Sequence, residues 1–195
     1  MNFLPEIALL SFVFFGLASP GPNVVLLNAS GARFGFRPTL PHIFGVAVGV
    51  GITSAVTGFG VGTILQAQPA LTLVLKIIAC GWILWMAWRL WHADSAQQKA
   101  GDRPFTFVEA VLFQWVNPKV WAVALAASAY VAHLPALDQA RQLAIAFAGL
   151  NLFVCLFWTA AGAALSYLLT NPLAWRIFMR IMASALAIFS VMVFL

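Results

Sequence analysis

Two short polar stretches interrupt long apolar segments, and they contain the residue types that bind a charged solute. The first lies in the apolar run 3–31 and consists of Pro20, Gly21, Pro22 and Asn23. The second lies in the run 106–132 and contains Gln114, Asn117, Pro118 and Lys119. Proline lacks an amide hydrogen and clashes with the carbonyl four residues earlier, so each stretch should break its helix. Irregular backbone at membrane depth is tolerated only inside protein or beside a watery cavity, which indicates a binding site.

The two breaks offer partners for both charges of a zwitterionic amino acid. The carboxylate needs donors, and the candidates are the helix N-terminus after Pro22, the Asn23 amide and Lys119. The ammonium needs acceptors, and the candidates are the carbonyls freed around Ala18 and Ser19 and the side-chain oxygens of Asn117 or Gln114.

Lys119 has two readings. A lysine within a span costs roughly 2.5–3.5 kcal/mol on insertion scales, so it should be functional or paired. It either binds the solute or partners a carbonyl at the end of the broken first helix. Proline kinks also serve packing alone, but breaks at matching places in two halves favour a transport site.

Carboxylates are scarce, and all five lie near the ends of apolar runs or between them. Glu109 is the deepest, about one turn into the fourth run, and it either couples transport to protons or pairs with a loop arginine. The scarcity favours a small neutral cargo over a dibasic one. It also argues against a metal site, because divalent cations need clustered oxygen or sulfur ligands. No cofactor is indicated. Cys80 and Cys155 lie in apolar runs and should be small buried hydrophobes.

The composition identifies the elements that must position these residues. Of 195 residues, 63% are hydrophobic and 8% are charged, whereas soluble domains carry about 25% charged residues. About 20 apolar residues cross a bilayer as a helix. The sequence therefore predicts a single all-α integral membrane domain over residues 1–195, with six spans at roughly 3–31, 41–64, 70–91, 106–132, 142–168 and 173–195. No basic run suggests nucleic acid.

Lysine and arginine predict the orientation of these spans in the lipid bilayer. The breaks after spans one, three and five carry Arg33, Arg37, Arg89, Lys99, Arg103, Arg176 and Arg180, whereas the other side has Arg141. The positive-inside rule then places both termini outside, in the periplasm of a bacterium. Because three spans is an odd number, the two halves should be inverted three-helix repeats, each opening with an interrupted helix.

Aromatic and small residues have their own interpretations. Trp82, Trp85, Trp88 and Trp91 lie near the cytoplasmic end of span three and indicate an interfacial belt rather than a cation–π ligand site. The pairs Gly45 with Gly49 and Gly58 with Gly62 allow close helix approach. They pack within one protomer or form the face of a homodimer.

The two broken stretches resemble the signature of the LysE/RhtB amino-acid exporters, also called LysE-type translocators. Pro20-Gly21-Pro22-Asn23 ends the first apolar run and Asn117-Pro118-Lys119 lies in the fourth. The length, the six segments and the basic stretch Gly35-Phe36-Arg37 also match, so the likeness covers the whole chain. It implies efflux of amino acids or close derivatives across the bacterial inner membrane, driven by the proton gradient. It does not name the cargo.

Other functions are weaker fits. An enzyme is disfavoured because the three histidines lie near span ends or in loops and no carboxylate cluster exists. A channel-like protein should show a clearer polar stripe along its spans. An exporter of a different small solute or cation is the remaining alternative.

Overall fold

A computed structural model describes residues 4–61, 67–93, 102–167 and 171–192, and every regular element within these ranges is helical. The predicted all-α fold is therefore confirmed. The helices are α1 (Leu4–Ala18), α2 (Pro22–Phe34), η1 (Arg37–Thr39), α3 (Leu40–Gly58), α5 (Pro69–Trp91), α6 (Phe107–Val116), α7 (Pro118–Val131), α8 (Ala136–Leu165) and α9 (Pro172–Met192). Lys99 and the predicted span ends at 3, 62–64, 168 and 193–195 lie outside the described residues.

Two of the predicted spans are bent pairs of helices. In the described part of the chain, four helices are long and apolar enough to cross a membrane. The axes of α1 and α2 differ by 57° and those of α6 and α7 by 66°, and counting each pair as one span gives six. The predicted interruptions of the first and fourth spans are thus confirmed. Helix α8 begins at Ala136, earlier than the predicted boundary at 142, because Pro135 precedes its first turn.

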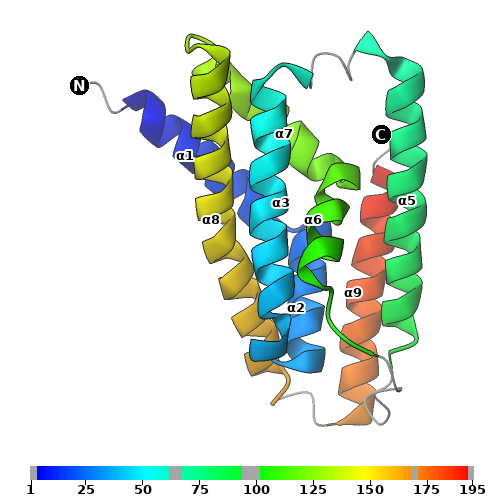
Figure 1. Cartoon of the computed structure of the whole chain (residues 1–195). Helices are drawn as coiled ribbons and strands as arrows, with labels where there is room; N and C mark the ends of the chain where they lie inside the picture. The colour runs from blue at the N-terminus through cyan, green and yellow to red at the C-terminus, as the bar shows by residue number, and fades with distance from the viewer. Residues whose placement is uncertain (1–3, 62–66, 94–101, 168–170, 193–195) are drawn as a thin grey trace.

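The two halves of the chain run in opposite directions (Figure 1). Helices α1 and α2 descend in this view, α3 ascends and α5 descends, whereas α6 with α7 ascends, α8 descends and α9 ascends. The beginning of α1 and the end of α9 both lie toward the upper end, and α2, α5 and α8 end at the lower end. This arrangement agrees with the predicted opposite entry of the two halves.

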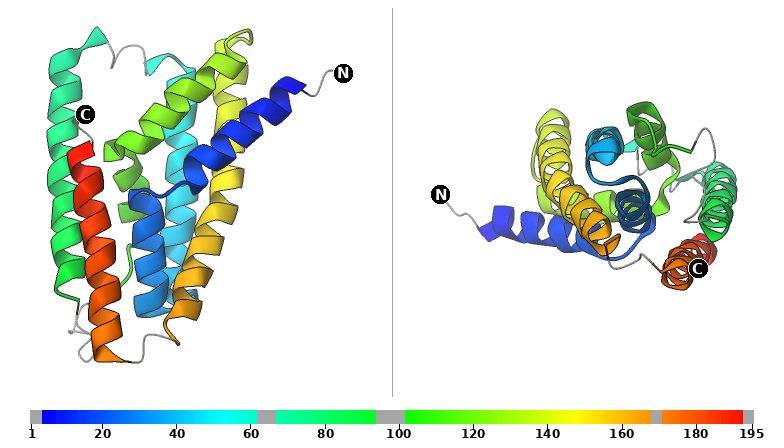
Figure 2. Two further views of the ribbon diagram at one scale, coloured as in Figure 1. Left: turned by 180° about the vertical axis from the view of Figure 1, so that it is seen from behind. Right: turned by 90° about the horizontal axis from the view of Figure 1, so that it is seen from below.

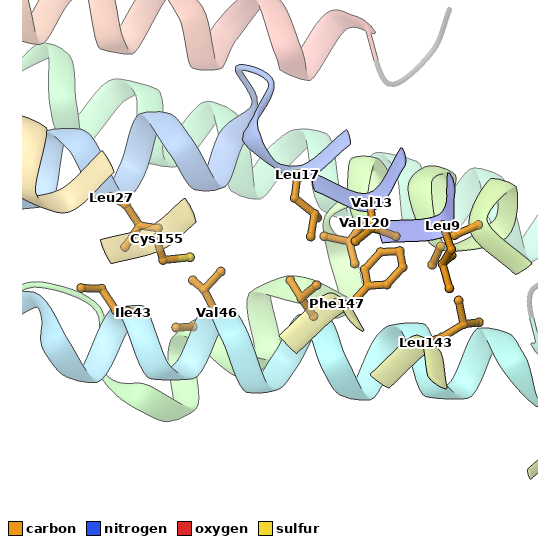
Figure 3. Close-up of a cluster of buried hydrophobic side chains, with 14 of the residues drawn as sticks. Leu9, Val13, Leu17, Leu27, Ile43, Val46, Val120, Leu143, Phe147 and Cys155 are labelled. Atoms are coloured by element: carbon orange, nitrogen blue, oxygen red, sulfur yellow. The ribbon is translucent and has the colours of Figure 1, made fainter. Parts of the chain in front are cut away.

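Helix α2 lies between two apolar clusters. One cluster joins α1, α3, α7 and α8 to Leu27 of α2 and Ala110 of α6, and its members in Figure 3 include Leu17, Val46 and Phe147. The other joins α5 and α9 to α2 and α6, with Ile83 and Met179 fully buried. The view from behind shows α5 and α9 as a pair beside the rest of the bundle (Figure 2). Because α2 contributes to both clusters, its position is fixed from two sides.

Glycines permit the closest helix contacts. A Cβ on Gly31 would lie 2.2 Å from the Thr159 carbonyl oxygen, and one on Gly162 would lie 2.0 Å from the Asn28 carbonyl oxygen. Helices α2 and α8 therefore touch backbone to backbone.

The paired glycines of the second span also pack inside the protomer. Gly45 and Gly49 face α6, and Gly58 faces α8, whereas Gly62 lies outside the described residues. The homodimer remains a prediction. Cys80 and Cys155 are both free thiols, and Cys155 lies in the core as predicted.

Candidate functional site

The first break separates α1 from α2 over Ser19, Pro20 and Gly21. The Ser19 hydroxyl donates to the Gly16 carbonyl at 2.9 Å, which ends α1. Gly21 has extended backbone (φ −177°, ψ 177°), and Pro22 is the first residue of α2. The carbonyls of Ser19 and Pro20 are thereby released from the α1 ladder and can accept hydrogen bonds from elsewhere.

The second break is a single residue, Asn117, which ends α6 and begins α7. Its backbone is extended (φ −83°, ψ 103°), as the following Pro118 requires. Its side-chain oxygen accepts from the Lys119 amide at 3.2 Å and so caps α7. Asn117 is buried, with 1% of its surface exposed. The residue that breaks the fourth span therefore also stabilises the start of the next helix.

The two breaks meet through a reciprocal pair of amides. Asn23 Nδ2 donates to Gln114 Oε1 at 2.8 Å, and Gln114 Nε2 donates to Asn23 Oδ1 at 3.2 Å. Gln114 also donates to the Ala110 carbonyl at 2.8 Å and is completely buried. A Cβ on Gly49 would lie 2.7 Å from Gln114 Cγ, so the glycine of α3 makes room for this side chain.

Lys119 forms the second link between the breaks. Its ammonium donates to the Ser19 carbonyl and, at 3.4 Å, to the Pro20 carbonyl. Gly21 makes room for it, since a Cβ there would lie 2.7 Å from Lys119 Cδ. Of the two readings of Lys119, the structure displays the contact with the carbonyl end of the broken first helix.

Glu109 lies away from both breaks. It is the third residue of α6, about 12 Å along the helix axis from Asn117 at 1.5 Å per residue. Its carboxylate accepts from Arg103 at 2.6 and 2.9 Å and forms a capping box with Thr106. Hydrogen bonding to this carboxylate raises the pKa of Arg103. The structure thus shows the pairing with a loop arginine, and a coupling role for Glu109 remains a prediction.

A cavity at the lower end of the bundle contains residues that the sequence analysis did not connect. It lies between α2, α3, α5 and the segment before α6 and is partly open to the outside. Its polar lining includes Arg33, His42, Arg89 and Arg103. We call it the arginine cavity. The signal available in the sequence was that these arginines come from two breaks, after spans one and three, on the same predicted side of the membrane.

The donor set of the site suits an organic solute rather than a metal ion. In the described ranges no group of three or more His, Cys, Asp or Glu side chains is placed to hold a metal. The breaks instead present carboxamides, an ammonium and main-chain carbonyls. This combination can hydrogen-bond to both an ammonium and a carboxylate group.

Comparisons with known proteins agree with this chemistry. The model of the LysE type translocator family matches residues 14–195. A cysteine/O-acetylserine efflux protein of Klebsiella pneumoniae is 29% identical over 58% of this chain and 58% of its own length, so the match spans less than two thirds of that relative. Proteins of the same name from Salmonella paratyphi A and Salmonella typhi are 23% identical over 74% of this chain and 75% of their own lengths. No solved structure matches.

Proposed function

Because this chain belongs to the LysE type translocator family, we propose that it exports amino acids or close derivatives across the bacterial inner membrane. Translocators move solutes rather than transform them, so the expectation of a transporter and not an enzyme is confirmed at the level of the family. The cargo, the driving force and the orientation are parts of the proposal.

The observation that carries the proposal is the meeting of the two broken spans. Asn23 of the first break bonds with Gln114 beside the second, and Lys119 of the second bonds to Ser19 in the first. Interrupted helices from the two halves, joined near mid-membrane by polar side chains, are the arrangement in which transporters bind substrate. We propose that Pro20, Gly21, Pro22, Asn23, Gln114, Asn117, Pro118 and Lys119 form this site.

A zwitterion can replace the observed contact of Lys119 with two complementary ones. The cargo ammonium would take the carbonyls of Ser19 and Pro20, and the cargo carboxylate would take the Lys119 ammonium. The interaction that joins the breaks would then depend on occupancy. Because that interaction bridges the two halves of the chain, binding would bias their relative arrangement.

The cargo is proposed to be a small neutral amino acid. Neither break contains a carboxylate to balance a second positive charge on a dibasic cargo. The relatives are named for cysteine and O-acetylserine, both of which carry one carboxylate and one ammonium. An exporter of another small solute or cation, or a channel-like protein, is the alternative.

The proton gradient is the proposed driving force, and both termini are proposed to be periplasmic. In the described ranges, the segments at the end of the bundle opposite the start of α1 contain Arg33, Arg37, Arg89, Arg103 and Arg176, as the positive-inside rule expects of the cytoplasmic end. Alkaline phosphatase fused to the C-terminus should therefore be active, and the same enzyme fused after His92 should be inactive. The reverse pattern would overturn the orientation.

Transport into everted inner-membrane vesicles tests the function. These vesicles expose the cytoplasmic face, so an exporter drives uptake. We expect uptake of L-cysteine and O-acetyl-L-serine that is abolished by an uncoupler, and little uptake of L-lysine. No uptake of any of these above vesicles lacking the protein would refute amino-acid export. Uptake that persists with the uncoupler but never exceeds the external concentration would support a channel.

A further inference from the structure

We propose that the arginine cavity is a second binding site, on the cytoplasmic side of the breaks, which receives the carboxylate of the cargo before the cargo reaches them. The inference rests on the proposed export function, because it assigns the cargo class to the cavity. It is carried by three observations: two arginines that share one carboxylate, a buried histidine without a hydrogen-bond partner among the described residues, and the position of the cavity on the same face of α2 as Asn23 of the first break.

Two arginines share one carboxylate among the described residues of this cavity. Arg103 pairs with Glu109 at 2.6 Å, and Arg33 pairs closely with Asp102. Arg89 approaches the same Asp102 at 3.7 Å, so one carboxylate serves two guanidiniums. An anionic group of a ligand, such as a carboxylate, would give Arg89 a partner that it need not share.

Arg89 is the arginine best placed to bind that anion. Its side chain is half-buried and stacks on the Trp85 ring at 5.1 Å, which orients the guanidinium. A guanidinium held in this way can still direct its N–H groups at a carboxylate, and such pairs are among the stronger hydrogen bonds in proteins. Stacking on an aromatic ring also limits the side-chain entropy that binding would otherwise cost.

His42 supplies independent support for a ligand. It lines the cavity with 2% of its surface exposed, and neither ring nitrogen has a hydrogen-bond partner among the described residues. Its ring lies 5.0 Å from the ring of Phe105. A buried polar group without a hydrogen-bond partner costs stability. A carboxylate in the cavity would accept from this imidazole and remove that cost.

The remaining lining is largely apolar. Side chains such as Met86 and Leu90 surround the cations, as in sites that bind small organic solutes. Along α2 the lining residues Leu26, Ala29 and Arg33 recur at helical spacing, on one face of the helix. Asn23 precedes Leu26 by one turn on that face. The cavity therefore lies on the same face of α2 as Asn23, toward the other end of that helix.

The test compares Arg89→Gln with Arg89→Lys and with a matched control, Arg176→Gln. Arg176 is an exposed arginine of α9 on the same predicted side of the membrane, outside the cavity lining. For L-cysteine uptake into everted vesicles, Arg89→Gln should raise KM about tenfold, since loss of one charge-assisted contact has that scale. Its maximal rate should stay within about twofold of the parent. Arg89→Lys should recover part of the loss, and Arg176→Gln should behave as the parent.

A second comparison separates binding of the cargo carboxylate from binding of a lipid phosphate in the cavity. L-cysteinamide lacks the carboxylate, so it should inhibit L-cysteine uptake only weakly. The inhibition should be equally weak for the parent and for Arg89→Gln. The parent and Arg89→Gln should differ in their KM for L-cysteine by the same factor in proteoliposomes of phosphatidylcholine with phosphatidylglycerol and without it. A difference seen only with phosphatidylglycerol would mean that the cavity binds a lipid headgroup and would overturn the proposal.

Binding separates this inference from the export function. L-cysteine binding to the purified protein in nanodiscs should weaken about tenfold in Arg89→Gln. Equal binding by parent and variant, or equal KM values in vesicles, would overturn the cavity as a carboxylate site. A parent that binds L-cysteine through Arg89 and transports none of the probes would refute the export function and leave the binding site standing.

Discussion

The ammonium of Lys119 donates a hydrogen bond to the carbonyl of Ser19, although the two residues belong to opposite halves of the chain. Lys119 is the second residue of α7, near the positive end of that helix dipole. Ser19 directly follows α1, whose last carbonyls carry partial negative charge. A cation is disfavoured at the start of α7 and favoured at the end of α1. The contact therefore joins the two halves at the depth of both breaks.

Replacing Lys119 by methionine should remove efflux while leaving the protein in the membrane. Loss of a charged hydrogen-bond partner costs roughly 1.5–3 kcal/mol, which corresponds to about a ten- to hundredfold lower rate. Initial uptake into everted vesicles, normalised to protein, measures the change. Lys76→Met is the matched control, because Lys76 is a half-buried lysine of α5 away from the breaks. Near-parental transport by Lys119→Met would exclude its role.

Gly21→Ala should displace Lys119 without unfolding the protein. The backbone of Gly21 is extended, so alanine adopts it without strain. The added Cβ would lie 2.7 Å from Lys119 Cδ, and the end of a flexible side chain can move away. We expect a parental Tm and uptake reduced about tenfold, since the Lys119 contact is charge-assisted. Gly81→Ala, which meets nothing within 4 Å, serves as the control. A parental rate in Gly21→Ala would show that the Lys119 contact is dispensable.

Gly162→Ala should instead destabilise the fold. Its Cβ would lie 2.0 Å from the Asn28 carbonyl oxygen, and backbone cannot yield as a side chain can. Overpacking of this kind costs typically about 1–3 kcal/mol. The change should appear as a lower Tm of the purified protein and a lower yield. Gly149→Ala in the same helix meets nothing within 4 Å and should keep or raise the Tm. Equal Tm values for both variants would contradict the backbone contact between α2 and α8.

Glu109→Gln should keep proton-driven uptake within about threefold of the parent. The carboxylate is bound by Arg103 and caps α6, and glutamine at the same position can still close a capping box. The ion pair is largely exposed, so solvent screening makes its loss a small change. Uptake is measured with and without an imposed pH gradient. A variant that transports cargo but no longer responds to the gradient would establish Glu109 as the coupling group.

Local rules were sufficient to predict the breaks. Pro20 and Pro22 stop one helix and start the next, and Pro118 forces Asn117 out of helical geometry, whatever surrounds them. The hydrogen-bond partners of the polar groups at the breaks depend instead on the tertiary packing of the helices. Asn23 and Gln114 are separated by 91 residues, and nothing in either stretch specifies that their amides pair.

The arginine cavity was beyond sequence reasoning for the same reason. Arg33, Arg89 and Arg103 were recognised as residues of one membrane face, where their charge serves orientation. Their convergence depends on how α2 and α5 pack around the segment before α6. His42 lies in the first turn of α3, and only the packing shows that its ring is buried beside Phe105.

The amide pair between the breaks should be energetically coupled. Asn23→Ala and Gln114→Ala each remove both hydrogen bonds of the pair, at 2.8 and 3.2 Å, and each leaves the other amide without its partner. The double variant removes both groups and should be impaired no more than the worse single variant. For each single variant we expect uptake about tenfold below the parent, because the remaining amide loses two hydrogen bonds.

Initial uptake rates of the parent, the two single variants and the double variant define the double-mutant cycle. Gln142→Ala, near the start of α8, is the control. Gln142 is half-buried and does not contact either break. Effects that multiply in the double variant would show that Asn23 and Gln114 act independently. In that case each amide would contact the cargo on its own, and the reciprocal pair would be a resting arrangement without a role in joining the halves.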